Sequence, residues 1–134
     1  MTSSSSSYRK KVYTKFGDLG ETSLLYGGRI SKNDLHTEAY GITDEAVSAM
    51  GLARATTDDP RVKDVLRDLQ RELFTIAAEL ATEPDKYELF QQHFQPVTQE
   101  MVTNLETIID RLEEDVEMPK VFILPGGSPS SAAI

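Results

Sequence analysis

Residues 59–80 carry the most regular pattern in the chain and read DPRVKDVLRDLQRELFTIAAEL. Asp59 and Pro60 are residue types preferred at the N-cap and the first turn of a helix. Apolar residues then recur at steps of three and four, which places them on one helical face. They are Val62, Val65, Leu66, Leu69, Leu73, Ile76, Ala77 and Leu80. The pattern predicts a long amphipathic helix that ends before Glu83-Pro84.

A second helix is predicted upstream, from a cap at Asn33 or Asp34 to about Thr56. Apolar residues at helical spacing define its expected inward face: Leu35, Ala39, Ile42, Ala46, Met50 and Ala53. Gly41 and Gly51 interrupt this helix, and each costs about 1 kcal/mol relative to alanine. We therefore expect another helix or a ligand to approach closely at these glycines.

A third helix is predicted downstream, with Thr98 as its N-cap. Its apolar stripe consists of Met101, Leu105, Ile108, Ile109, Leu112 and Val116. Residues 84–97 are expected to form a loop that connects the 59–80 helix to this helix. Four apolar or aromatic residues of this loop should pack over the bundle: Tyr87, Leu89, Phe90 and Phe94.

The last residues read VFILPGGSPSSAAI from Val121 to Ile134. Ser128 and Pro129 form another N-cap and first-turn pair, so a helix is predicted to begin there. Because isolated short helices are marginal, we expect the natural domain to continue beyond Ile134. Long helices with short connections predict an all-α, up-and-down helical bundle. One side of the 59–80 helix should be covered by further sequence or by neighbouring subunits.

Length and composition fit one domain, since the chain has 134 residues. The formal charge of −8 disfavours binding to nucleic acid and to anionic membrane surfaces. The absence of cysteine excludes disulfides, thiolate metal sites and a cysteine nucleophile. The Ser-rich residues 1–10 are expected to be a disordered tail without an apolar signal region. No apolar run reaches the roughly 20 residues that span a bilayer, so a cytoplasmic protein is expected.

The best candidate for chemistry is the loop YTKFGDLGET at residues 13–22. Gly17 and Gly20 allow the backbone to approach a ligand and to turn its N–H groups toward oxygen atoms. Asp18 could hold a metal ion or the loop's own backbone. Hydroxyl groups and a cation complete a possible phosphate cradle: Thr14, Thr22, Ser23 and Lys15. The loop lacks the Walker pattern, and a purely structural glycine-rich loop is the commoner alternative.

Further charged residues surround the start of the helix predicted from Asn33 or Asp34 to about Thr56. Arg29 and Lys32 precede it, and Lys32 lies where the helix dipole also favours anions. The alternative for Lys32 is a solvated side chain. Asp44, in the middle of the same helix, is either a solvated residue or half of an ion pair between helices. His36 and His93 are isolated, so no protein-held metal site is predicted.

Together these segments resemble the PduO-type ATP:cob(I)alamin adenosyltransferases. The resemblance runs from about residue 11 to the end and is carried by several motifs in register. They are Tyr13-Thr14-Lys15, Gly17-Asp18, Gly20, Thr22, Tyr26-Gly27-Gly28, Ser31-Lys32-Asn33-Asp34, Glu38-Ala39-Tyr40-Gly41, Thr43-Asp44-Glu45 and Phe122-Ile123-Leu124-Pro125-Gly126-Gly127-Ser128.

The resemblance implies a bundle of about five helices that forms a homotrimer with active sites between subunits. It implies binding of ATP with Mg²⁺ and of cobalamin, and transfer of the 5′-deoxyadenosyl group from ATP to cobalt with release of triphosphate. Cobalt(I) is then the nucleophile, so catalysis needs positioning and electrostatics rather than a nucleophilic side chain. On this basis residues 11–134 are a helical adenosyltransferase domain that lacks the family's C-terminal helices.

The resemblance also implies roles for single residues. Residues 14–22 match the family's ATP loop, and Lys32 matches its phosphate-contacting lysine. Asp44 matches an aspartate that pairs with an arginine of the adjacent subunit. Phe122 matches an aromatic residue that helps to displace the lower axial ligand of cobalamin. The expected ATP-binding set is Thr14, Lys15, Gly17, Asp18, Gly20, Thr22, Ser23 and Lys32, and the expected catalytic pair is Asp44 and Phe122.

Two departures from the family pattern bear on activity. Ala46-Val47-Ser48 stands where the family usually has a polar residue. The family's Arg-rich helix and a later ATP-contacting Asn follow the Gly-Gly-Ser loop and are absent up to Ile134. A chain ending there is expected to bind ATP poorly and to turn over little. The alternatives are a truncated, non-catalytic relative that serves as an assembly or cobalamin-binding partner, and an unrelated three-helix interaction module.

Overall fold

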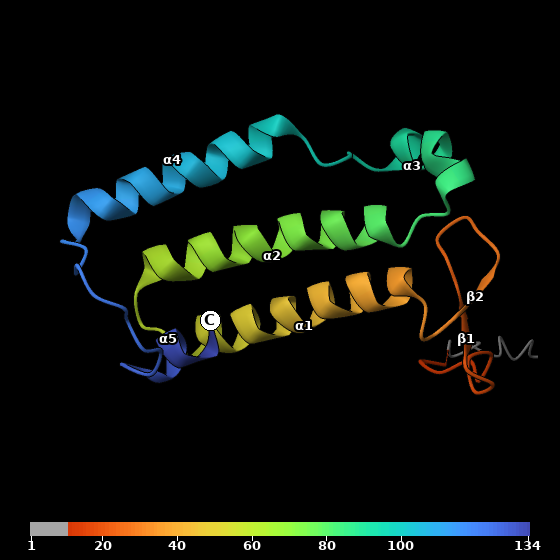
Figure 1. The fold of residues 1–134 in the computed structure, drawn as a ribbon, viewed down its shortest axis with the longest axis horizontal. Coiled ribbons are helices and arrows are strands. Elements are labelled where there is room, and N and C mark those ends of the chain that lie inside the picture. Colours follow the sequence, from red (N-terminus) through yellow and green to blue (C-terminus); the bar gives the residue numbers. More distant parts are fainter. Residues whose placement is uncertain (1–10) are drawn as a thin grey trace, which may run out of the picture.

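The computed structural model describes residues 11–134, so the Ser-rich tail at 1–10 lies outside the described residues. The described chain is mainly helical, as predicted (Figure 1). All three long helices and the short C-terminal one lie where the sequence predicts them. In chain order the elements are β1 (Glu21–Ser23), β2 (Arg29–Ser31), α1 (Leu35–Thr56), α2 (Pro60–Leu80), η1 (Pro84–Lys86), α3 (Tyr87–His93), α4 (Gln99–Asp115) and α5 (Pro129–Ala133).

The predicted caps explain where the helices begin. The Asp34 carboxylate accepts a hydrogen bond from the His36 amide at 2.9 Å and caps α1. Asp59 caps α2 in the same way. Thr98 caps α4, and Ser128 caps α5 in a reciprocal capping box with Ser131. Each cap satisfies backbone N–H groups that the first turn of a helix leaves without a partner.

The helices α1 and α2 lie side by side and antiparallel (Figure 1). Gln70 donates from Nε2 to the carbonyl of Val47 at 2.8 Å across this contact. A Cβ added at Gly51 would lie 3.2 Å from the same Nε2 atom, so the expected close approach of a helix occurs at this glycine. Apart from its chain neighbours and the backbone of α1, no atom of the described chain lies within 4 Å of a Cβ added at Gly41, so no other helix of the described chain approaches closely there.

The predicted inward face of α1 is fully buried only at its C-terminal end. Ala53 is fully buried under α5, where Ser130 donates from Oγ to the Ala53 carbonyl at 3.0 Å. Leu35 and Ile42 lie on the same face but are 79% and 59% exposed, so their predicted burial is wrong. The reason is that α5 has five residues and reaches only the last turns of α1.

The prediction of a loop at residues 84–97 also needs correction. This segment contains η1 and the seven-residue helix α3. Phe90 is fully buried and stacks on Tyr87 and Phe94, with ring centroids 5.8 and 5.3 Å away. Tyr87 and Phe94 remain 38% and 42% exposed. A helix this short has no stable isolated form, so it depends on the burial of Phe90.

The helix α4 runs beside α2 in the opposite direction and is attached near both of its ends (Figure 1). Glu79 of α2 accepts hydrogen bonds from the Tyr87 hydroxyl at 2.6 Å and from the Val97 amide at 2.8 Å. Arg61 forms an ion pair with Asp115 at 2.6 Å near the other end. The stripe predicted for α4 is largely uncovered, since Ile109, Leu112 and Val116 are about half exposed.

Across residues 11–134, no helix is both long enough and apolar enough to cross a membrane.

Candidate functional site

The sequence predicts a loop with at most a short extended piece before α1. The structure instead has a small two-stranded hairpin in this segment. β1 pairs with β2 antiparallel, with Thr22 opposite Ile30 and Ser23 opposite Arg29. The turn is closed by a hydrogen bond from the Leu24 amide to the Gly28 carbonyl at 3.2 Å. The sequence signals for this turn were weak, because the strands have only three residues each.

The tip of the hairpin is fixed to the end of α2. The Leu25 amide donates to the Ala81 carbonyl at 2.7 Å, and the Glu83 amide donates to the Leu25 carbonyl at 3.1 Å. A Cβ added at Gly27 would lie 2.5 Å from Oε2 of Glu83, so this position requires glycine. The hairpin is therefore held in place by residues more than fifty positions away in the sequence.

The part of the candidate phosphate loop that precedes β1 makes two successive turns. The Asp18 amide donates to the Lys15 carbonyl at 3.3 Å, and the Gly20 amide donates to the Gly17 carbonyl at 3.2 Å. Lys15 and Gly20 have φ angles of 64° and 84°, the left-handed region that glycine adopts without cost. The Lys32 amide donates to the Gly20 carbonyl at 2.9 Å, so the loop is tied to the entry of α1.

The Lys32 side chain extends back over this loop. Its Nζ lies 3.0 Å from the position of a Cβ added at Gly17, and the Glu21 carbonyl lies 3.2 Å from that position. Any side chain at residue 17 would therefore displace the ammonium group or the strand. Among the described residues, Lys32 forms no ion pair. The structure thus brings together the loop, an exposed ammonium group and the N-terminus of a long helix, which are the parts of an anion site.

The predicted hydroxyl groups do not all face one ligand. Thr22 and Ser23 are neighbours in β1, so their side chains point to opposite faces of the hairpin. Thr14 accepts a hydrogen bond from the Phe16 amide at 3.4 Å and supports the loop itself. The Lys15 ammonium lies 5.8 Å from the Tyr13 ring centroid, a cation–π arrangement.

Two carboxylates near the loop, Asp34 and Asp18, differ in their environment. Hydrogen bonds from the His36 amide and side chain hold the pKa of Asp34 below its ordinary value, so this cap stays ionised at neutral pH. Asp18 is exposed on the loop. Within residues 11–134, no group of three or more carboxylate, histidine or cysteine side chains is arranged to hold a metal ion.

The two residues predicted as catalytic lie away from the loop. Asp44 is exposed on α1, ten positions after the Asp34 cap, which corresponds to about 15 Å along a helix. Phe122 is fully exposed in the segment between α4 and α5. This segment and the hairpin lie at opposite ends of the molecule (Figure 1). The described chain therefore does not bring Asp44 and Phe122 to the loop.

The family model described as cobalamin adenosyltransferase matches residues 12–134. The chain belongs to this family. A corrinoid adenosyltransferase of Citrobacter freundii is 35% identical over 124 residues, which cover 92% of this chain and 69% of the relative. A corrinoid adenosyltransferase of Bacillus subtilis is 41% identical over 130 residues, which cover 92% of this chain and 63% of the relative.

A solved structure agrees in fold with this adenosyltransferase-family chain. It is a single-residue variant of a PduO-type ATP:corrinoid adenosyltransferase from Lactobacillus reuteri, complexed with cobalamin and ATP. The TM-score is 0.80 at 32% identity, over 92% of this chain and 67% of that one. The chain spans from 33% to 69% of the length of the curated relatives named PduO or corrinoid adenosyltransferase.

Sequence reasoning undervalued one residue near the loop. Arg29 stood out only as a nearby cation, but its guanidinium donates to the Phe16 carbonyl at 2.6 Å. The sequence held no clear signal for this contact, because it depends on a hairpin register that places Arg29 opposite Ser23 and diagonal to Glu21, and strands of three residues do not reveal that register.

Proposed function

We propose that this chain is the nucleotide- and corrinoid-binding part of a cytoplasmic ATP:corrinoid adenosyltransferase. The reaction transfers the 5′-deoxyadenosyl group of ATP to cob(I)alamin and gives adenosylcobalamin and triphosphate. The family match over residues 12–134 supports this proposal, and so does the likeness to a structure that contains ATP and cobalamin. The cytoplasm supplies ATP and a reducing environment that suits a reduced corrinoid.

The ATP phosphates are proposed to bind over the loop at residues 14–23. The observation that carries this proposal is the Lys32 ammonium, which lies against Gly17 without an ion-pair partner in the described chain. The proposed ATP-binding set remains Thr14, Lys15, Gly17, Asp18, Gly20, Thr22, Ser23 and Lys32. Mg²⁺ is proposed to arrive with ATP, held by phosphate oxygens and water with at most Asp18 from this loop. That arrangement fits the usual preference of Mg²⁺ for few protein ligands.

The corrinoid is proposed to bind at the Phe122 end. The Phe122 side chain is fully exposed, and Val121, Ile123 and Leu124 beside it are at least 63% exposed. A neighbouring apolar hollow is lined by Ile109, Leu112, Glu113, Val116 and Met118. Contiguous exposed apolar surface of this kind marks a place where a ligand or a partner binds.

The two halves of the site are proposed to come from different copies of the chain. The loop lies beyond the N-terminus of α1, and the segment between α4 and α5, which contains Phe122, lies at the other end of α1 (Figure 1). The 22 residues of α1 separate the two ends by about 33 Å. No single ATP molecule can touch both ends of one chain. A homotrimer, with Asp44 paired to an arginine of the next subunit, is the assembly that we propose.

The proposed step needs no nucleophilic side chain. The electron pair of cobalt(I) forms the Co–C5′ bond while the C5′–O bond breaks, and the electron pair of the broken bond leaves with the triphosphate. The protein has to hold the ribose carbon in line with cobalt and to stabilise charge on the leaving group. Lys32 is proposed to supply part of that charge stabilisation.

The test is to mix the chain with Mg-ATP and chemically reduced cobalamin and to follow loss of the cobalt(I) absorbance. The chain is compared with the same chain extended by the C-terminal part of the Bacillus subtilis relative. ATP-dependent loss of cobalt(I) is expected for the extended chain. Lys32→Ala should weaken ATP binding about tenfold through loss of a charged contact, with unchanged helical circular dichroism. A folded, extended chain without ATP-dependent turnover would refute the proposed function.

A further inference from the structure

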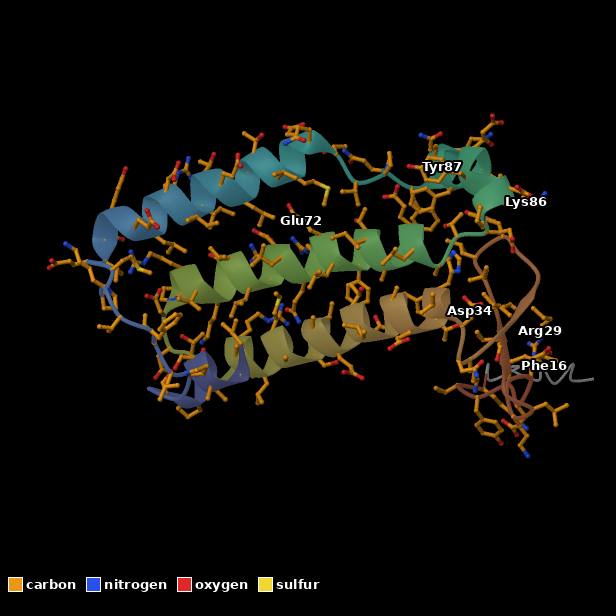
Figure 2. All side chains as sticks on the ribbon, in the orientation of Figure 1. Phe16, Arg29, Asp34, Glu72, Lys86 and Tyr87 are labelled. Carbon is orange, nitrogen blue, oxygen red and sulfur yellow. The ribbon has the colours of Figure 1, made fainter. Side chains whose placement is uncertain are left out.

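The Arg29 side chain forms hydrogen bonds to the backbone of the candidate phosphate loop. Its Nη2 donates to the Phe16 carbonyl at 2.6 Å and to the Glu21 carbonyl at 3.3 Å. Its Nε lies 3.5 Å from Oε2 of Glu21. Figure 2 shows Arg29 and Phe16 next to each other at the hairpin end of the molecule. One guanidinium group therefore joins β2, β1 and the loop that precedes β1.

The position of Phe16 makes this contact important for loop shape. Phe16 lies between Lys15, which has a φ of 64°, and Gly17, which lies under the Lys32 ammonium. The Phe16 side chain is 78% exposed, so burial does not hold this part of the loop. The contact from Arg29 is the shortest hydrogen bond between the loop and the hairpin in the described chain. Without it, the turn at Lys15–Asp18 would rest on two long hydrogen bonds, from the Asp18 amide to the Lys15 carbonyl at 3.3 Å and from the Phe16 amide to the Thr14 hydroxyl at 3.4 Å.

Arg29 and Lys32 thus differ in what their charges do. The guanidinium of Arg29 donates hydrogen bonds to two carbonyl groups and pairs with a carboxylate, whereas Lys32 has no ion pair in the described chain. A planar guanidinium can serve several acceptors in a fixed geometry, and a lysine ammonium cannot reproduce that fork. The requirement at residue 29 is therefore for shape and not only for positive charge.

We propose that Arg29 is a positioning residue, which holds the loop at residues 15–20 in the shape that binds the phosphates of ATP. This inference rests on the nucleotide site proposed above. It assigns Arg29 to the loop backbone and Lys32 to the nucleotide, so substitutions at the two positions should fail in different ways.

The first measurement needs no nucleotide. We expect trypsin to cleave after Lys15 when the loop opens, and mass spectrometry identifies the new peptide that begins at Phe16. At low protease concentration the cleavage rate follows the population of the open loop. Arg29→Ala and Arg29→Lys are both expected to raise this rate by about tenfold, the effect of one lost charge-assisted hydrogen bond. Lys32→Ala is the matched control and should leave the rate within about twofold.

The second measurement is Mg-ATP affinity, followed by the NMR shifts of the Gly17 and Gly20 amides in the chain extended by the C-terminal part of the Bacillus subtilis relative. Both Arg29 variants and Lys32→Ala should weaken binding about tenfold. In the turnover assay, the Arg29 variants should raise the KM for ATP and keep kcat at saturating ATP. The KM for the corrinoid should stay unchanged.

Two results would overturn the inference. Unchanged cleavage after Lys15 in Arg29→Ala would show that Arg29 does not hold the loop. Wild-type ATP affinity in Arg29→Lys would show that positive charge alone suffices. Absence of ATP binding by the extended chain without any substitution would count against the proposed function instead, and the cleavage rates would still decide whether Arg29 shapes the loop.

Discussion

The helices α2 and α4 have the same kind of sequence and very different surroundings. Each has an N-cap and a regular apolar stripe. Leu66 of α2 is 4% exposed, whereas Leu112 of α4 is 45% exposed. The difference arises because α1 lies along α2, while α4 is attached near its ends through Glu79 and through the ion pair of Arg61 with Asp115.

This difference shows that an amphipathic pattern encodes a face but not its partner. Burial of a leucine stabilises the fold only to the extent that other atoms cover it. In the described chain α2 has such cover and α4 has little. We therefore expect α2 to depend on side-chain packing, and α4 to depend on the polar contacts that attach it.

The largest expected effect tests this contrast directly. Leu66→Ala should lower the free energy of unfolding by about 2–4 kcal/mol, because it leaves a cavity between α1 and α2. The matched Leu112→Ala should cost less than about 1 kcal/mol in the isolated chain. Urea denaturation of both variants, followed by circular dichroism, measures the difference. Equal losses would mean that α4 is packed as tightly as α2 in solution.

An intermediate effect is expected at the attachment of α4. Glu79→Ala removes the acceptor for both the Tyr87 hydroxyl and the Val97 amide, so it should cost about 1–2 kcal/mol. It should also increase proteolysis in the segment at residues 94–98. Glu79→Gln keeps one amide oxygen as an acceptor and should lose less. Unchanged proteolysis in Glu79→Ala would show that other contacts hold the start of α4.

The smallest effect concerns pH. The hydrogen bond to Glu79 raises the pKa of Tyr87 above its ordinary value of about 10, so the folded state holds this proton more tightly than the unfolded state. The stabilisation is therefore complete below pH of about 10 and is lost as pH rises through the folded-state pKa. Unfolding measured from pH of about 9 to about 11.5 should show a slightly steeper loss for the unaltered chain than for Tyr87→Phe. Parallel curves would contradict this attribution.

The fold was predictable wherever local signals agreed. Asp59, Thr98 and Ser128 each mark a helix start that the structure confirms. The helix α3 was missed because its seven residues lack a side-chain cap and its order comes from the burial of Phe90. The burial predicted for Leu35 and Ile42 was wrong because α5 covers only the other end of that face.

The candidate site was predictable in its residue types and less so in its geometry. Gly17 and Lys32 were assigned to one ATP-binding set, and the Lys32 Nζ lies 3.0 Å from the position of a Cβ added at Gly17, whereas their binding roles stay predictions. The roles of Asp44 and Phe122 stay predictions, since both lie away from the loop within one chain. The contact from Arg29 to Phe16 depends on the hairpin register, which three-residue strands do not signal.

The sequence by itself determined the helices, their starts and the glycine-rich loop, because capping, periodicity and backbone freedom are local properties. Tertiary structure alone decided which apolar faces are covered, where Arg29 and Lys32 direct their charges, and that the loop and Phe122 lie at opposite ends. Those outcomes depend on contacts between residues far apart in the chain, and no short window of sequence contains both partners of such a contact.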